Sequence, residues 1–266
     1  MESTADQASV VGEYDDVLQA LLQLLWGDGF LSPGGAEEIR RLLAGSDIRG
    51  CRVLDVGAAL GAVDQLLVQE HGAASVVGVD VDPTMLRQLD QRIARAGLSA
   101  QVTSLCVAPG PLPVADASFD VVFSKDSIVQ IPDKRALFSD VFRILRPGGR
   151  FIASDWLRGG CGDYSPEMAE YFRLEGIVYN MASIEESIAA LQAAGFTDIE
   201  VFDRNEWYLE LARRELDSLA GPMYPLLVER LGADKADHFV RNWRQLVLVV
   251  ERGELRPGHL KATRPA

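Results

Sequence analysis

Short apolar runs alternate with helical periodicity through the middle of the chain. The runs are rich in β-branched residues and stop at glycine, proline or acidic positions, which is typical of buried strands. They span residues 52–56, 75–80, 100–105, 119–124 and 150–155. Apolar residues at three-to-four spacing follow and predict helices over residues 60–71, 83–96 and 134–145. Strands that are apolar on both faces and separated by helices predict a parallel sheet covered on both sides, with ligands bound beyond the carboxyl ends of its strands.

Helical patterns flank this core at both ends. We expect an apolar helix from Tyr14 to Leu25, and a second one from Pro33 to Leu43 with Ser32 as its cap. A helix, a sixth strand, a largely helical segment and a last strand follow the core and are expected at residues 184–194, 197–203, 204–252 and 258–263. This order predicts an α/β fold with a Rossmann-like, seven-stranded, mostly parallel sheet whose last strand is antiparallel to its neighbours.

Composition and charge narrow the range of partners. The 266 residues are 48% hydrophobic, which suffices for a full core, and 26 Lys and Arg stand against 39 Asp and Glu, giving a net charge of −13. Such a surface repels nucleic-acid phosphate and anionic lipid, so we expect neither nucleic acid nor membrane as a partner. The acidic, polar start MESTADQAS does not resemble a signal peptide, and no apolar run approaches the roughly 20 residues that span a bilayer. We therefore expect a cytoplasmic protein.

Cysteine and histidine residues give no sign of a metal site. Cys51, Cys106 and Cys161 are odd in number, far apart and without ligand spacing, so we expect reduced thiols in the core. The histidines are equally scattered, and no metal is predicted.

The stretch RVLDVGAALGAV, residues 52–63, has the shape that a nucleotide-type cofactor needs. A strand runs into Gly57, a second glycine follows at Gly61, and a helix then begins. Glycine lets a ligand approach the backbone, and the helix N-terminus offers unpaired N–H groups. A dinucleotide dehydrogenase would show G-x-G-x-x-G, and the spacing here differs. Asp55 lies two residues before Gly57, and Asp80 closes the second strand, where its carboxylate can accept hydrogen bonds from both hydroxyls of a ribose.

These residues resemble motif I of the class I S-adenosyl-L-methionine (SAM) methyltransferases. The chain departs from that motif at Ala59, which replaces the middle glycine of G-x-G-x-G, and at Ala108, which replaces an acid near the adenine. Losing the acid forfeits one hydrogen bond of roughly 1 kcal/mol. The resemblance implies SAM as the cofactor, held with a weakened adenine contact.

Several further segments resemble the phosphoethanolamine N-methyltransferases and related small-molecule methyltransferases. They are WGDGFLSPGG (26–35), VLDVGAALG (53–61), FSKDSIVQIPDK (123–134), ILRPGGRFIASDW (144–156) and HLKATRP (259–265), in the family's order. The resemblance implies that Ser32, Val81 and Lys125 also lie around the cofactor, with Asp55, Gly57, Gly61 and Asp80. It further implies one methyltransferase domain, with an N-terminal flank at 12–45, a SAM-binding core at 46–203, a helical lid at 204–257 and the last strand at 258–266.

The catalytic pair of that family is a tyrosine and a histidine. By the resemblance these positions fall on Tyr14 and Gln130, and the family's phosphate-binding lysine falls on Leu246. A glutamine amide cannot take a proton from an ammonium substrate as a histidine can. Both replacements argue against phosphoethanolamine as the acceptor.

Other residues are candidates for the acceptor side. Asp126 would hold a cationic substrate or act as a weak base, or else only cap a helix. Tyr14 would orient a nucleophile, or belong only to an amphipathic helix face. Asp155 and Trp156, which end the fifth strand, would face the substrate, where the indole could stack on a cation; core packing is the alternative for Trp156.

The leading hypothesis is therefore methyl transfer from SAM to an N-, O- or C-nucleophile of a small molecule, of the kind found in specialised metabolism. The apolar segments 12–45 and 204–252 favour an enclosed pocket over a macromolecular substrate. The alternative is a SAM-binding protein that no longer methylates and serves sensing or another reaction.

Overall fold

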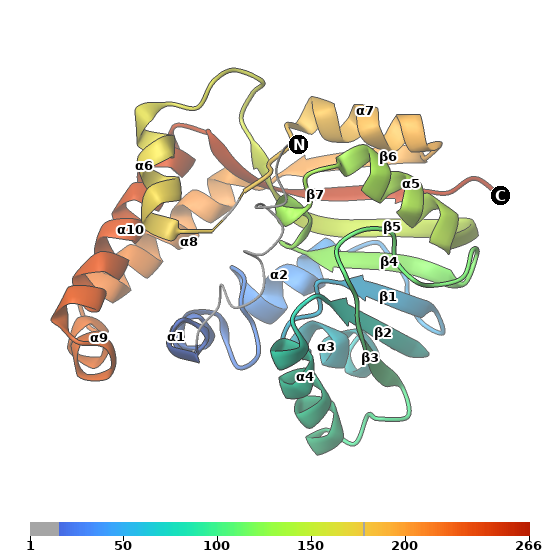
Figure 1. The fold of residues 1–266 in the computed structure, drawn as a ribbon, viewed down its shortest axis with the longest axis horizontal. Helices are drawn as coiled ribbons and strands as arrows, with labels where there is room; N and C mark the ends of the chain where they lie inside the picture. Colours follow the sequence, from blue (N-terminus) through green and yellow to red (C-terminus); the bar gives the residue numbers. More distant parts are fainter. Residues whose placement is uncertain (1–15, 178) are drawn as a thin grey trace, which may run out of the picture.

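Seven strands form one sheet in the order β3-β2-β1-β4-β5-β7-β6 (Figure 1). The computed structural model describes residues 16–177 and 179–266. The strands are β1 (Arg52–Val56), β2 (Ser75–Asp80), β3 (Val102–Cys106), β4 (Phe119–Lys125), β5 (Leu145–Arg158), β6 (Thr197–Asp203) and β7 (Leu255–Thr263). β1 to β5 run parallel, whereas β7 inserts between β5 and β6 and is antiparallel to both. The predicted Rossmann-like sheet with an antiparallel last strand is confirmed.

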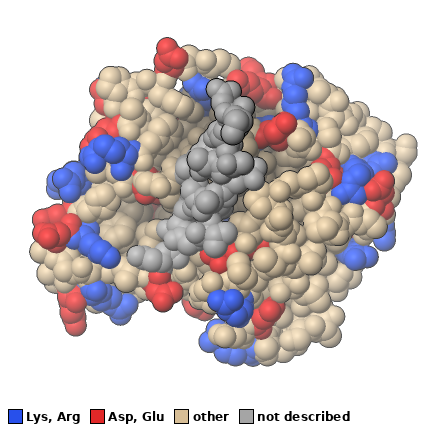
Figure 2. All heavy atoms as spheres, in the orientation of Figure 1, with Lys and Arg blue, Asp and Glu red and all other residues tan. Residues whose placement is uncertain are grey.

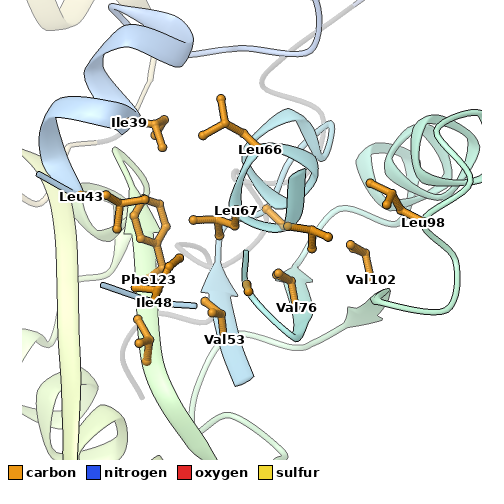
Figure 3. Close-up of a cluster of buried hydrophobic side chains, with 14 of the residues drawn as sticks. Ile39, Leu43, Ile48, Val53, Leu66, Leu67, Val76, Leu98, Val102 and Phe123 are labelled. Atoms are coloured by element: carbon orange, nitrogen blue, oxygen red, sulfur yellow. The ribbon is translucent and has the colours of Figure 1, made fainter. Parts of the chain in front are cut away.

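Helices cover both faces of the sheet. The first group is α2 (Gly35–Leu42), α3 (Ala62–Gln69) and α4 (Pro83–Arg95), and the second is α5 (Lys134–Ile144) and α7 (Ile184–Ala194). Adjacent strand residues point to opposite faces. Val53 therefore packs with Ile39 and Leu67 of the first group (Figure 3), while Leu54 packs with Phe138 and Leu191 of the second. This double coverage explains why the strands are apolar throughout.

A third apolar cluster lies at one end of the sheet and forms the lid (Figure 1). Its helices are α1 (Asp16–Trp26), α6 (Pro166–Glu175), α8 (Asn205–Ala220), α9 (Tyr224–Leu231) and α10 (Ala233–Glu251). One buried carboxylate joins three of them, since Glu215 of α8 accepts hydrogen bonds from the indole N–H groups of Trp26 at 2.6 Å and Trp243 at 3.1 Å. Burial raises the pKa of Glu215, and these two hydrogen bonds oppose the shift.

A buried ionic cluster ties α2 to the last strand. Glu38 accepts both Arg204 Nε and Nη2 at 2.8 Å, and its Oε1 lies 2.7 Å from His259 Nε2 of β7. Glu38 is 2% exposed and the Arg204 side chain 15% exposed. The N-terminal flank, the start of α8 and β7 are thus held at one point.

Several predicted boundaries are wrong. Helix α2 begins at Gly35 after the left-handed Gly34, so Ser32 does not cap it. β5 starts at Leu145 and continues to Arg158, beyond the predicted 150–155 at both ends, because Leu145 pairs with Phe119 of β4 and the residues up to Arg158 pair with β7. β7 begins at Leu255, within the predicted lid segment. Helix α6 was not expected, although Ser165 caps it and Pro166 opens it.

The cysteines also differ from expectation. Cys51, Cys106 and Cys161 are free, but Cys106 and Cys161 are exposed and Cys51 is only partly buried, so they are not core thiols. Cys106 has the apolar neighbours Leu105 and Val107, but it ends β3, a strand at the edge of the sheet.

Charged side chains are mixed over the surface. On the face in Figure 2, Lys and Arg lie interspersed with Asp and Glu and do not gather into one basic area. Within residues 16–177 and 179–266, no helix combines the length and the apolar character needed to cross a membrane.

Candidate cofactor and acceptor site

The loop between β1 and α3 turns back on itself in left-handed conformations at three alternate positions. The φ angles are 82° at Gly57, 46° at Ala59 and 78° at Gly61. A Cβ at Gly57 would overlap the Ser127 hydroxyl, and one at Gly61 would lie 2.6 Å from Leu89 Cγ, so both positions need glycine. Ala59 keeps the loop geometry at a conformational cost of roughly 1 kcal/mol. The alanine at the middle glycine position of the motif is thus itself left-handed.

Asp80 lies at the rim of this loop, at the end of β2. Its Oδ2 accepts the Ala59 N–H at 2.9 Å and its Oδ1 accepts the Asp82 N–H at 3.0 Å. Burial raises the pKa of Asp80, while these backbone hydrogen bonds favour the ionised form. Each carboxylate oxygen retains a further lone pair. The oriented carboxylate can therefore accept two hydroxyl groups of a diol.

Two more carboxyl groups are buried beneath the loop. Asp55 Oδ1 and both side-chain oxygens of Asp64 have no hydrogen-bond partner in the described part of the chain. Gly78 provides the space for Asp64, because a Cβ there would lie 2.8 Å from Asp64 Oδ1. Burial raises the pKa of Asp55 and raises that of Asp64 to about 7, and the Asp80 carboxylate adds to both shifts. Asp64 was not identified from the sequence, where it is simply a polar residue in a first helical turn.

We expect Asp64→Asn to stabilise the protein at alkaline pH. A carboxyl whose folded pKa is raised from 3.8 to about 7 costs no stability below pH 4, costs more as pH rises to 7, and costs a constant amount above it. The amide should raise the free energy of unfolding by roughly 2–4 kcal/mol at pH 8 and by little at pH 4. Urea denaturation at the two pH values measures the difference. An equal gain at both would show that ionisation is not the cause.

The segment 26–35 docks against the glycine loop through Arg92 of α4. The guanidinium donates to Asp28 Oδ2 at 2.7 Å and Oδ1 at 2.9 Å, and its Nε donates to the Leu60 carbonyl at 3.1 Å. Gly29 admits the guanidinium, since a Cβ there would lie 2.5 Å from Arg92 Cζ. Ser32 follows in this docked segment and is partly buried. Arg92 was not identified from the sequence as the residue that joins the two segments.

Residues at the adenine side of the predicted site are more open. Val81 is partly buried directly after Asp80, and its carbonyl lies 3.9 Å from Cys106 Sγ. Ala108, at the position where the family has an acid, is exposed.

Lys125 and Asp126 form an ion pair at the end of β4. Asp126 is left-handed with φ 54°, its N–H donates to the Ser154 carbonyl at 2.7 Å, and its Oδ1 accepts the Ser154 hydroxyl at 2.8 Å. The Lys125 and Asp126 side chains are each 5% exposed. Asp126 is not a helix cap, because Ser127 occupies that position. Both oxygens of the Asp126 carboxylate are thus engaged, one by Lys125 and one by the Ser154 hydroxyl.

Gln130 ends a short 3-10 helix, η1 (Ile128–Gln130), that three elements hold in place. Asp155 Oδ1 accepts the Val129 N–H at 2.9 Å. Lys134 Nζ donates to the carbonyls of Ile128 and Ile131, both at 2.6 Å. The backbone position of Gln130 is therefore fixed from β5 and α5.

The third anchor of η1 is Asn180. Its N–H donates to the Val129 carbonyl at 2.7 Å and its Nδ2 to the Gln130 carbonyl at 3.1 Å. Burial raises the pKa of Asp155 to about 7 and lowers that of Lys134 to about 8, and each group's charge opposes the other's shift. Neither Lys134 nor Asn180 was identified from the sequence.

Asp155 and Trp156 lie on opposite faces of β5, because successive strand residues alternate. Asp155 is buried, and its carboxylate accepts the Val129 N–H of η1. Trp156 packs edge-on against Tyr208 of α8 with ring centroids 4.9 Å apart. Leu246 is buried in the lid cluster, and Tyr14 lies outside the described residues.

Comparison with known proteins defines the class. Residues 53–149 match the model described as a methyltransferase domain. The chain is 31% identical over 159 residues to the O-methyltransferase rstn1 of Aspergillus nomiae, an alignment that covers 59% of this chain and 69% of that protein. The chain belongs to the class I SAM-dependent methyltransferases.

Within that class the chain is similar to phosphoethanolamine N-methyltransferases. It is 31% identical over 242 residues to phosphoethanolamine N-methyltransferase 1 of Zea mays, which covers 90% of this chain and 47% of the maize protein. It also resembles the structure of Haemonchus contortus phosphoethanolamine N-methyltransferase 2 in complex with SAM, with a TM-score of 0.87, 26% identity, and coverage of 96% of this chain and 58% of that one. The chain spans about half the length of these plant relatives.

Proposed function

We propose that this chain binds SAM at the glycine loop and transfers its methyl group to a small-molecule acceptor. The observation that carries the proposal is the Asp80 carboxylate, held by the Ala59 and Asp82 N–H groups at the rim of a loop that needs glycine at Gly57 and Gly61. The SAM complex of the Haemonchus contortus relative supports the same cofactor. We also propose that flank, core, lid and last strand act as one methyltransferase domain.

The residues present fit SAM. Asp80 would bind its ribose, the unpaired oxygen of Asp55 offers an acceptor for its amino group, and the Gly57 and Gly61 backbone leaves room for its chain. Ser32, Val81 and Lys125 are proposed to complete the site. When bound, SAM supplies an electrophilic methyl group on a sulfonium.

The protein's own contribution is alignment and exclusion of water. η1 is fixed at its backbone, so Gln130 can hold an acceptor by hydrogen bonds from or to its amide. Trp156 of β5 packs against Tyr208 of α8, and this pair would cover the space beyond the strand ends. Alignment and a dry site can supply several kcal/mol to an in-line displacement. A nucleophile that is already deprotonated then needs no histidine.

Two measurements test this proposal. Calorimetric titration with SAM should show binding, and its absence would refute the proposal at the first stage. Incubation with labelled SAM and a panel of amines, carboxylates and keto acids should transfer label to at least one small molecule.

We further propose that phosphoethanolamine is not the acceptor. Gln130 cannot accept its ammonium proton, and Leu246 is buried among apolar lid residues at the position of the family's phosphate-binding lysine. The similarity to the plant phosphoethanolamine N-methyltransferases therefore indicates a shared fold rather than a shared methyl acceptor.

We expect Gln130→His to confer no methylation of phosphoethanolamine. The new imidazole would provide a base, but the phosphate would still meet Leu246 and the acidic groups of the lid. Labelled-methyl transfer to phosphoethanolamine, with SAM affinity as the control for an intact site, measures the outcome. Turnover by the variant would show that the phosphate is bound elsewhere, and it would contradict the proposal that phosphoethanolamine is not the acceptor.

A second candidate function is SAM binding without methyl transfer. The observation that favours it is Gln130 itself, a residue that cannot titrate, on a turn that is otherwise firmly held. The fold accommodates such a change of chemistry, since the [4+2]-cyclase SpnF shares it with a TM-score of 0.65 at 21% identity. Label transfer in the acceptor panel would eliminate this candidate.

A further inference from the structure

A polar cluster lies within the lid, away from the glycine loop. Glu175 ends α6, and its carboxylate accepts hydrogen bonds from the Asn242 side-chain amide of α10 and from Tyr179. The Tyr179 hydroxyl also lies 3.3 Å from the Tyr171 hydroxyl. These four residues are here named the lid polar cluster.

One hydrogen-bond acceptor of the lid polar cluster has no donor among the described residues. Asn242 is 4% exposed, and its Oδ1 has no hydrogen-bond partner in the part of the chain that the structure describes. The amide cannot be reversed, because Oδ1 would then face the Glu175 carboxylate. A buried amide oxygen without a donor is costly, so a donor from outside the chain would be favoured there.

The rings of Tyr171 and Tyr179 in this cluster pack with the ring of Phe172. Phe172 stacks on Tyr179 with centroids 5.6 Å apart, and Tyr171 lies 6.1 Å from Tyr179. The faces of such rings attract cations. Ring faces, a carboxylate and a free amide oxygen together suit a positively charged group with N–H bonds.

The charged groups around the cluster also favour a cationic ligand. Burial raises the pKa of Tyr208, and the acidic groups Glu215, Glu175 and Asp126 raise it further. Burial likewise raises the pKa of Glu175, and no cation among the described residues acts against it. Tyr208 contacts Trp156 at the end of β5, so the cluster is continuous with the proposed acceptor space.

We propose that Tyr171, Glu175, Tyr179 and Asn242 bind an alkylammonium group of the methyl acceptor. The acceptor thus carries a cationic amine as a binding group, separate from the atom that takes the methyl group, and a phosphate monoester or a carboxylate in its place is disfavoured by the Glu175 carboxylate. The inference rests on the proposed function in one respect, that the bound alkylammonium belongs to the methyl acceptor. The binding site itself is inferred from Asn242 Oδ1 and the residues around it.

Titration of the full chain with n-butylammonium and with butyrate tests this site, monitored by nuclear magnetic resonance with and without saturating SAM. We expect the cation to bind at least tenfold more tightly than the anion. Glu175→Gln should weaken n-butylammonium at least tenfold, and Asn242→Ala at least threefold, while the Kd for SAM stays within twofold. Glu170→Gln, in an exposed pair with Arg173 on the same helix, is the matched control and should change neither Kd.

Equal binding of butyrate, or full retention of n-butylammonium binding by Glu175→Gln, would overturn the site. The unfolding midpoint of each variant shows whether it is folded, and Asn242→Ala gives a second decision if Glu175→Gln is unstable. Loss of SAM binding by the wild-type chain would instead refute the proposed function, and the titration without SAM would still decide the site.

Discussion

Glu38→Ala should lower the free energy of unfolding by about 3–5 kcal/mol. The substitution leaves the Arg204 guanidinium, whose side chain is 15% exposed, without its anion, and His259 loses the same partner. A buried charge without a partner is among the costliest single defects in a fold. Because Glu38 joins α2, the start of α8 and β7, the loss should also loosen the flank against the sheet. Urea denaturation at pH 7 measures it.

Glu37→Ala, at an exposed position of the same helix, is the control and should change stability by less than about 0.5 kcal/mol. Burial favours the neutral acid, but hydrogen bonds from His259 and Arg204 outweigh it and lower the pKa of Glu38 below its ordinary 4.5. A lowered carboxyl pKa stabilises the fold above that value, and this contribution is lost as pH falls below it. The difference in stability between wild type and Glu38→Ala should therefore narrow as pH falls below 4.5. A constant difference down to pH 3 would contradict an ionic origin.

Asp80→Ala should weaken SAM binding about 100-fold. The carboxylate is the acceptor proposed for two ribose hydroxyls, and hydrogen bonds to charged groups contribute roughly 1.5–3 kcal/mol each. The substitution also releases the Ala59 N–H from the 2.9 Å bond that fixes the middle of the glycine loop. Calorimetry on the purified variant provides the Kd.

Two variants separate these effects. Asp80→Asn keeps one acceptor oxygen and should lose less affinity than Asp80→Ala. Asp90→Ala removes an exposed acid of α4 that bonds only Ser104 among the described residues, and should leave the Kd unchanged. Unchanged SAM affinity in Asp80→Ala would mean that the ribose lies elsewhere.

The strands of the core could be predicted closely because their information is local. β1, β2 and β6 have the predicted bounds, and so does α7, which Ser183 and Glu186 begin with a reciprocal capping box. The length of β5 could not be predicted in this way, because its last residues form a strand by pairing with β7, about a hundred positions later in the sequence. Helix α6 carried a local signal in Ser165 and Pro166 that was overlooked.

The proposed cofactor side of the site could also be predicted from sequence, because glycine at fixed offsets indicates the backbone conformation directly. Gly57 and Gly61 are left-handed where the motif requires it, and Asp80 lies at their rim. The long-range contacts that hold the site in place could not be predicted from sequence. Arg92 reaches Asp28 across 64 positions and Asn242 reaches Glu175 across 67, and no local pattern encodes such contacts.

The place of β7 between β5 and β6 has a consequence for how the protein assembles on the ribosome. The parallel strands β1 to β5, with the glycine loop and Asp80, are synthesised before any residue of β7 exists. Until then β5 is an open edge with unpaired backbone groups, a template for wrong pairing, and β6 has no neighbour to pair with. Closing the sheet needs contacts of very high sequence separation, which form slowly. The nascent chain should therefore form the strands that carry the glycine loop early. It should add β7 and β6 and complete the lid only in a last step, during which it is exposed to aggregation.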